Sequence, residues 1–234
     1  TGTSNTAVGK NALYANTTAS GNTAVGTNAG DAITTGYHNV ALGGFALSTN
    51  ISGAQNVAVG YEALFNNIAN NITAVGHDCL KANTSGTSNV GLGYQALLAN
   101  TTGAVNTAVG NSALDANTSG GHNTAVGTTS LGAATTANNN TAVGYAALDA
   151  ITTGSSNTGV GYDALGVTTT GSNNTAIGIA SGHAVTTGGN NLLLGHDAGL
   201  TGSPGGVIDT ENNQIVLGDE NITNAHIQVD WTVA

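Results

Sequence analysis

Six histidines are the first residues to consider as metal ligands or proton-transfer groups: His38, His77, His122, His183, His196 and His226. Zinc sites gather histidine and cysteine ligands at short, recurring spacings. No His-x-His pair and no carboxylate partner at ligand spacing accompanies these residues, so we expect them to lie on the surface or in packing contacts. Only several chains around a common axis would bring copies of one histidine together. The sequence predicts no metal site and no cofactor.

The acidic side chains also lack a catalytic arrangement. Asp31, Asp115 and Asp149 occupy the same position of a repeat but lie two or more repeats apart. Glycoside hydrolysis needs two carboxyl groups within several ångströms of each other, so we expect these three to be solvated. Five more acids gather near the C-terminal end without the ligand spacing of a calcium loop: Asp209, Glu211, Asp219, Glu220 and Asp230. Serine, histidine and aspartate have no triad context, and we predict no catalytic residue.

The tyrosine side chains could contribute to ligand binding, and neither they nor the cysteine shows a catalytic arrangement. Tyr61, Tyr94, Tyr145 and Tyr162 each directly follow a repeated glycine. If exposed, Tyr145 and Tyr162 on adjacent repeats would form a stacking surface for sugar rings; alternatively, the tyrosines cover an edge of the fold or a chain interface. Cys79 replaces alanine at a position of small residues, which predicts a buried, unreactive thiol.

Composition excludes several classes of partner. The 234 residues include 2 basic and 12 acidic side chains, a net charge of −10, which cannot neutralise a nucleic-acid backbone or an anionic membrane. Apolar runs are only a few residues long, so we expect no membrane insertion. Although 39% of residues are hydrophobic, most are Ala and Val, with 2 Phe, 1 Trp and no Met. We therefore do not expect one large core.

A repeat built on Asn-Thr-Ala-Val-Gly dominates the chain. Its glycine recurs 17 residues apart, with one step of 16 and a last step of 23. The shortened unit has Ile72 where the others have Asn, and the long step contains a turn-rich insertion at 202–206. The glycines are Gly9, Gly26, Gly43, Gly60, Gly76, Gly93, Gly110, Gly127, Gly144, Gly161, Gly178, Gly195 and Gly218.

The positions of one unit, for example residues 140–154, suggest its local structure. Thr141 and Val143 share one face of an expected strand, and Ala142 points to the other. We expect the Thr and Val positions inside the coil and the Ala or Gly position where another chain approaches. Leu148 adds a further core residue. The segment that follows, before an Asn-Thr-Thr-Gly-like chain reversal, could be a short strand or a helical turn. Because it lacks period-two alternation, we expect a helical turn or an irregular arc.

A 17-residue unit is too short for two helices or a βαβ crossover. It predicts a mainly β fold, a parallel β-solenoid or β-roll, with about 12 coils over residues 1–200 and a capping or transition segment over 201–234. A single narrow coil buries little apolar surface, so we expect chains to associate. One asparagine per coil should stack into a ladder that fixes the register: Asn5, Asn22, Asn39, Asn56, Asn89, Asn106, Asn123, Asn140, Asn157, Asn174 and Asn191.

The units NTAVGYAALDAITTG (140–154) and NVGLGYQALLANTTG (89–103) resemble repeats of bacteriophage and viral tail-fibre or tailspike proteins. They are more distantly similar to the head repeats of YadA-like trimeric autotransporter adhesins, which are shorter and prefer Ser-Val. The first resemblance implies a homotrimeric virion fibre that attaches to a glycan or protein receptor on the host. The second implies an adhesin on a bacterial surface. A glycan-degrading tailspike enzyme would need the paired carboxylates that we do not find.

The end of the chain carries a second resemblance. The segment NNQIVLGDENITNAHIQVDWTVA (212–234) is similar to the residues that precede the self-cleaving intramolecular chaperone of phage endosialidases and tail fibres. That resemblance implies a maturation cleavage after Ala234 and a chaperone, later released, that assembles the trimer. Because the chain also starts at Thr1 rather than Met, we expect it to be part of a longer protein.

Overall fold

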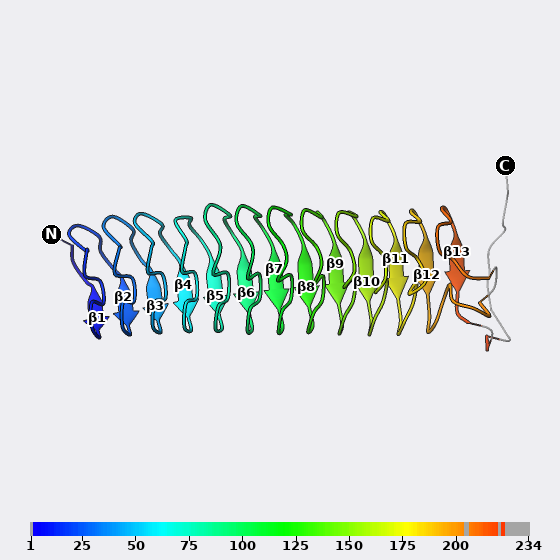
Figure 1. Ribbon diagram of the computed structural model, residues 1–234, viewed down its shortest axis with the longest axis horizontal. Helices are drawn as coiled ribbons and strands as arrows, with labels where there is room; N and C mark the ends of the chain where they lie inside the picture. Colours follow the sequence, from blue (N-terminus) through cyan, green and yellow to red (C-terminus); the bar gives the residue numbers. More distant parts are fainter. Residues whose placement is uncertain (1, 204–205, 220, 223–234) are drawn as a thin grey trace.

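The computed structural model describes residues 2–203, 206–219 and 221–222. They form thirteen strands of three residues, all parallel and in sequence order within one sheet (Figure 1). The strands are β1 (Thr6–Val8), β2 (Thr23–Val25), β3 (Val40–Leu42), β4 (Val57–Val59), β5 (Thr73–Val75), β6 (Val90–Leu92), β7 (Thr107–Val109), β8 (Thr124–Val126), β9 (Thr141–Val143), β10 (Thr158–Val160), β11 (Thr175–Ile177), β12 (Leu192–Leu194) and β13 (Ile215–Leu217).

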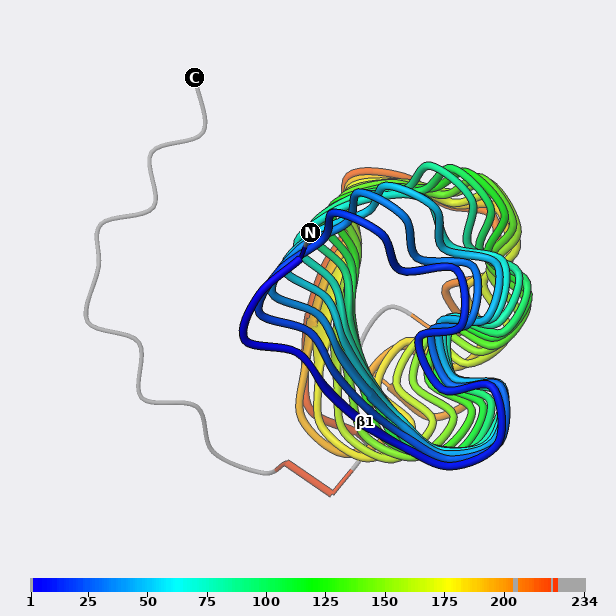
Figure 2. The same ribbon diagram turned by 90° about the vertical axis from the view of Figure 1, so that its left-hand side faces the viewer.

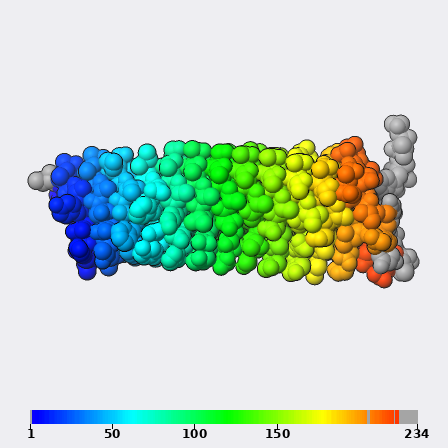
Figure 3. Space-filling model, in the orientation of Figure 1, coloured from blue at the N-terminus to red at the C-terminus, as the bar shows by residue number. Residues whose placement is uncertain are grey.

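Each strand begins one coil of a β-solenoid, which confirms the predicted fold class. Seen along the rod, successive coils nearly superimpose, with the strand on one side and a folded arc on the other (Figure 2). The stacked coils make an elongated body of nearly constant width (Figure 3). The described part of the chain contains no helix, and therefore none that could cross a membrane.

Equivalent residues of successive coils pair directly. Thr141 pairs with Thr158 and Val143 with Val160, and the same register continues along the sheet. The 16-residue coil keeps this register, since Val57 still pairs with Thr73. Its missing residue is absorbed in the turn after Asn67, whose side chain bonds two residues ahead instead of the usual three. Turn length, rather than the strand, therefore accommodates the irregularity.

The strand faces are the reverse of the predicted ones. The central Ala of β9, Ala142, is fully buried, and the central residues of the other strands from β2 to β13 are buried too, whereas Val143 is 36% exposed. The cause is the narrow interior, which the arc's leucines already fill. At Gly159 an added Cβ would lie 3.2 Å from Leu148 Cγ. The central residue of β1 to β11 is Ala or Gly, and larger inward residues, Leu193 and Val216, occur only in the last two strands. The expectation that the Thr and Val positions are inside and the Ala position faces another chain was therefore wrong.

The repeated glycine ends each strand with a conformation that other residues rarely adopt. Gly43 has a φ of +136°, and a Cβ there would lie 2.5 Å from the carbonyl oxygen of Gly60 in the next coil. Both the backbone dihedral and the close approach of the next coil require glycine. This explains why the glycine is the least variable position of the repeat.

Between the strands, the arc consists of a series of turns, which confirms the expected irregular arc rather than a second strand. Backbone hydrogen bonds from residue i+3 to residue i, such as Ile151 N–H donating to Leu148 O at 3.3 Å, alternate with hydrogen bonds to the next coil. Leu148 itself adopts a left-handed φ of +55° and donates to Ala164 O. The left-handed residues fold the arc back toward the sheet and direct the leucines into the core, where they are buried.

The predicted asparagine ladder is present and lies at a buried corner. Asn123 Oδ1 accepts a hydrogen bond from the Asn140 backbone N–H of the next coil at 3.0 Å, and its Nδ2 donates to Ala137 O at 2.8 Å. The ladder therefore bonds mainly to backbone rather than amide to amide. It is interrupted at Ile72 and resumes at Asn89. It reaches the last coil despite the long step, since Asn191 Oδ1 accepts from Gln214 N–H.

A second amide ladder was not predicted. It links four buried asparagines at the end of the arc, Asn67, Asn83, Asn100 and Asn117. Asn100 Nδ2 donates to Asn83 Oδ1 and Asn117 Nδ2 to Asn100 Oδ1, each at 2.7 Å. The ladder ends because the next coil has Ala134 at this position, and Asn117 Oδ1 is left buried without a partner among the described residues.

We predict that Asn123→Ala lowers the free energy of unfolding by about 2–3 kcal/mol, because it leaves the Asn140 N–H and the Ala137 carbonyl buried without partners. Urea denaturation followed by circular dichroism measures the change. Asn111→Ala, at an exposed position with no side-chain hydrogen bond among the described residues, is the matched control and should change stability by less than about 0.5 kcal/mol. Equal effects of the two substitutions would contradict a stabilising ladder.

The inward column also contains a compensated pair. A Cβ added at Gly91 would lie 2.5 Å from Cys79 Sγ, so the larger thiol is accommodated because the next coil has Gly in place of Ala. We predict that Gly91→Ala costs about 1–3 kcal/mol, and that adding Cys79→Ala restores most of it by recreating the Ala–Ala packing of other coils. Thermal or urea denaturation of the two single variants and the double variant tests this. Additive losses would refute the coupling.

Candidate functional site

The outward side of the sheet, which we call the strand face, runs along all thirteen strands. It consists of the first and third residues of all thirteen strands. The first residues are Thr, Val, Leu or Ile, and the third are Val, Leu or Ile, so the strand face carries no charged side chain. Its aliphatic members that expose at least 36% of their surface are Val8, Val25, Val90, Leu92, Val126, Val143, Ile177, Ile215 and Leu217.

Exposed aliphatic side chains on a protein surface are ordinary when scattered, but here the third residue of every strand is aliphatic and either half-buried or exposed, so these residues follow one another along the rod. Val8 is 57%, Leu92 47% and Ile215 60% exposed, at the beginning, middle and end of the rod. A contiguous apolar stripe of this kind typically marks an interaction surface. The strand face is therefore a candidate site for association.

The predicted tyrosines lie in one row after the repeated glycines and are 46–55% exposed. Tyr145 and Tyr162 stack with centroids 5.3 Å apart and an interplanar angle of 11°. Stacking hides the two facing sides of the rings. A sugar ring could therefore stack only on the outer side of each tyrosine, and the pair presents mainly its ring edges along the row.

Tyr61 and Tyr94 are brought together by a residue that sequence analysis did not assign to them. His77 lies between them, with centroids 5.3 Å from Tyr61 and 5.7 Å from Tyr94. Phe45 extends the group at 5.9 Å from Tyr61. The four tyrosines thus form two separate groups, three coils apart, instead of one continuous binding row.

A small charged network lies beside the first aromatic group. Lys81 contacts Glu62 and lies 3.1 Å from Asp78, and His77 Nδ1 lies 3.1 Å from Asp78 Oδ2. The hydrogen bonds that Lys81 donates to Glu62 and Asp78 raise the pKa of Lys81, and a hydrogen bond with Glu62 raises the pKa of Tyr61. The Lys81 amine is therefore held in its charged form and is not a nucleophile.

Other histidines and acids are less isolated than the sequence suggested. His183 Nδ1 lies 3.3 Å from Asp163 Oδ2, and His196 Nδ1 lies 3.2 Å from Asp197 Oδ2. Asp115 and Asp149 are half-buried rather than fully solvated, and desolvation raises the pKa of both carboxyls. No group of three or more His, Cys, Asp or Glu among the described residues could hold a metal ion. His226 and Asp230 lie outside the described residues.

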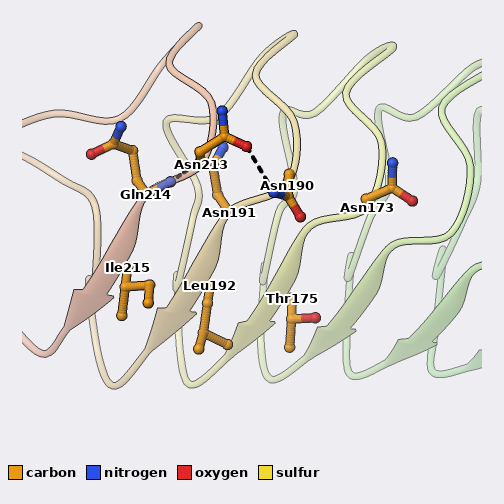
Figure 4. Close-up of a pocket in the computed structure, with 8 residues that line it drawn as sticks. All are labelled: Asn173, Thr175, Asn190, Asn191, Leu192, Asn213, Gln214 and Ile215. Carbon is orange, nitrogen blue, oxygen red and sulfur yellow. Dashed lines mark hydrogen bonds between the residues drawn. The ribbon is translucent and has the colours of Figure 1, made fainter. Parts of the chain in front are cut away.

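Two adjoining hollows near the C-terminal end were missed by sequence analysis. Both adjoin a row of three exposed asparagines, Asn173, Asn190 and Asn213, which we call the amide row. Figure 4 shows the residues that line the smaller hollow. The hollow of about 320 Å³ faces the strand face and is also lined by Thr175, Leu192 and Ile215. The hollow of about 510 Å³ faces the turns. The sequence signal for this row is that the residue before the ladder position is Asn in each of the last three coils, whereas it varies in the other coils.

Comparison with known proteins identifies no relative: no family model, no curated protein and no solved structure matches this chain.

Cys79, the one cysteine of the chain, lies in the core and is not an activated nucleophile. Cys79 is fully buried, and desolvation raises the pKa of its thiol to about 12. The prediction of a buried residue is confirmed.

We predict that Cys79 of the folded protein reacts with Ellman's reagent at pH 8 at least about a thousandfold more slowly than an ordinary exposed thiol, since only the thiolate attacks. Absorbance of the released thionitrobenzoate measures the rate. Protein unfolded in urea, and an Asn111→Cys variant in a Cys79→Ala background, should both react rapidly. Equally fast labelling of folded native protein would contradict the buried placement.

Proposed function

We propose that this chain is a structural segment of a viral tail fibre that attaches to a host surface as a homotrimer. The fold is compatible with this role, because stacked coils make a long, regular rod without a deep pocket between separate domains. The observation that carries the proposal is the strand face, which is apolar, uncharged and present in every coil.

Association of chains through the strand face would explain its composition. A soluble single chain gains nothing from displaying aliphatic side chains along its entire length, and covering them removes the cost of hydrating them. Every chain repeats the same 17-residue coil, so the residues of one strand face can meet those of another at the same axial spacing over many coils. The number three comes from the resemblance of the repeats to trimeric fibres.

The remaining surface fits a passive fibre better than an enzyme. The hollows beside the amide row are lined by no carboxylate, and the half-buried Asp115 and Asp149 do not line them. The proposed assembly by a C-terminal chaperone, with cleavage after Ala234, concerns a position outside the described residues. In this proposal the arcs and turns remain exposed and contact the host receptor, a glycan or a protein.

Light scattering after size exclusion tests the assembly. We expect a mass of three times the 22.7 kDa chain. The double variant Val109→Glu/Val126→Glu places two charges on the strand face and should yield single chains, because a charge is costly to bury in an apolar interface. The matched control, Asn111→Glu/Thr128→Glu, places two charges on the same two coils just past the glycine and should keep the native mass. A native mass of 22.7 kDa would refute the trimer.

The attachment role is tested separately with fluorescently labelled protein and a broad panel of intact bacteria. We expect saturable adhesion to particular strains, competed by unlabelled protein. Absence of adhesion to every strain, with the trimer intact, would refute attachment and leave a purely structural shaft.

A further inference from the structure

The amide row differs from the rest of its column in chemistry. The residue one place before each ladder asparagine is Ser, Gly, His, Gln, Val or Asn along the chain, but it is Asn in all of the last three coils. Asn173, Asn190 and Asn213 are exposed, and Asn190 Nδ2 donates to Asn213 Oδ1 at 2.7 Å (Figure 4). The row therefore presents carboxamides at successive coils, about 4.8 Å apart as in any parallel sheet.

The backbone under these amides is held in place. Each of the three residues has a left-handed φ of 59–62° and donates its N–H to the preceding coil: Asn173 to Ser155 O, Asn190 to Ser172 O and Asn213 to Gly189 O, at 2.9–3.1 Å. The next residue of the two earlier coils is a buried ladder asparagine. A site with a fixed backbone loses little conformational entropy when a ligand binds, so the amides are preorganised.

Several polar side chains lie beside the amide row, and some of them have no hydrogen-bond partner among the described residues. The larger hollow is lined by Thr170, Ser172, Thr187 and Asn212 besides the amides themselves. Thr170 and Thr187 are exposed, and neither their hydroxyls nor the Asn173 amide makes a hydrogen bond within the described residues. A carboxamide both donates and accepts, as a hydroxyl does, so each coil offers several complementary contacts to a polyhydroxylated ligand.

The charges near the amide row indicate whether its ligand is neutral or charged. No charged side chain lines either hollow. The nearest charges in sequence, Asp197, Asp209, Glu211 and Asp219, are acidic and lie in the step between β12 and β13 or just after it. An anionic ligand would find no cation to pair with and would be repelled by these carboxylates. An uncharged ligand encounters neither cost.

We propose that the amide row binds a neutral polysaccharide, whose chain lies parallel to the rod and hydrogen-bonds through its hydroxyls to Asn173, Asn190 and Asn213. Repeating sugars would meet repeating amides, so weak contacts add along the chain. An extended peptide is a poorer fit, because the backbone N–H groups of the row are already bonded to neighbouring coils. This inference rests on the proposed attachment role and specifies its ligand.

The test uses the full chain and an array of purified bacterial surface polysaccharides sorted into neutral and acidic members. The variant Asn173→Ser/Asn190→Ser/Asn213→Ser shortens the amides to a residue that the same column already holds at Ser156, with a φ of 61°. The control, Asn139→Ser, changes an exposed amide of the same column at a φ of 59°, outside the hollows. Denaturation and light scattering verify that both variants remain folded and assembled.

We expect native protein and the Asn139→Ser control to bind one or more neutral polysaccharides, and the triple variant to bind them at least tenfold more weakly. Binding to no neutral member, binding to acidic members only, or full binding by the triple variant would overturn the inference. Adhesion to intact bacteria is measured in parallel. If cells bind native and triple-variant protein equally, the amide row is refuted but attachment stands; if no cell binds either protein, the proposed function itself fails.

Discussion

The structure depends on one constraint: each coil must hydrogen-bond to the next in register, at the spacing of neighbouring strands, through the same backbone groups every time. Thr141 stacks on Thr158 and Val143 on Val160, and the arcs bond in the same manner. Any position that approaches the next coil too closely must then be glycine, as at Gly43. Any buried polar group must find its partner one coil away, as Asn123 does.

This stacking leaves a narrow interior, and the width decides where the apolar residues go. The arc leucines fill the space opposite the sheet, so the inward residue of β1 to β11 is Ala or Gly, and only the last two strands hold Leu193 and Val216 there. The larger aliphatic residues are consequently displaced to the outside and form the strand face. Small residues inside and large apolar residues outside are the opposite of an ordinary globular core. If chains associate through the strand face, as proposed, these outward aliphatic residues become buried between chains.

The parts of the fold that repeat could be predicted from the sequence, and the parts that depend on width or on departures from the repeat could not. The period and the polar column predicted the solenoid and the Asn123 ladder, and the small column predicted the burial of Cys79. Alternation in Thr-Ala-Val distinguishes two faces but does not identify the inner one, because that depends on how closely the arc packs. The second ladder, the stacking of His77 between tyrosines and the amide row involve positions that vary between coils, so a consensus conceals them.

The central claim is that the aliphatic strand residues point outward and that other chains cover the strand face. Hydroxyl-radical footprinting of the native protein tests this claim most directly, with oxidation measured by mass spectrometry of peptides. The account predicts that peptides containing Val126 and Val143 are protected from oxidation in the native assembly. When charged substitutions at other strand-face positions dissociate the assembly, these peptides should become oxidised. Leu148 should be protected in both states. Strong oxidation of Val126 and Val143 in the native assembly, or protection that persists in single chains, would contradict it.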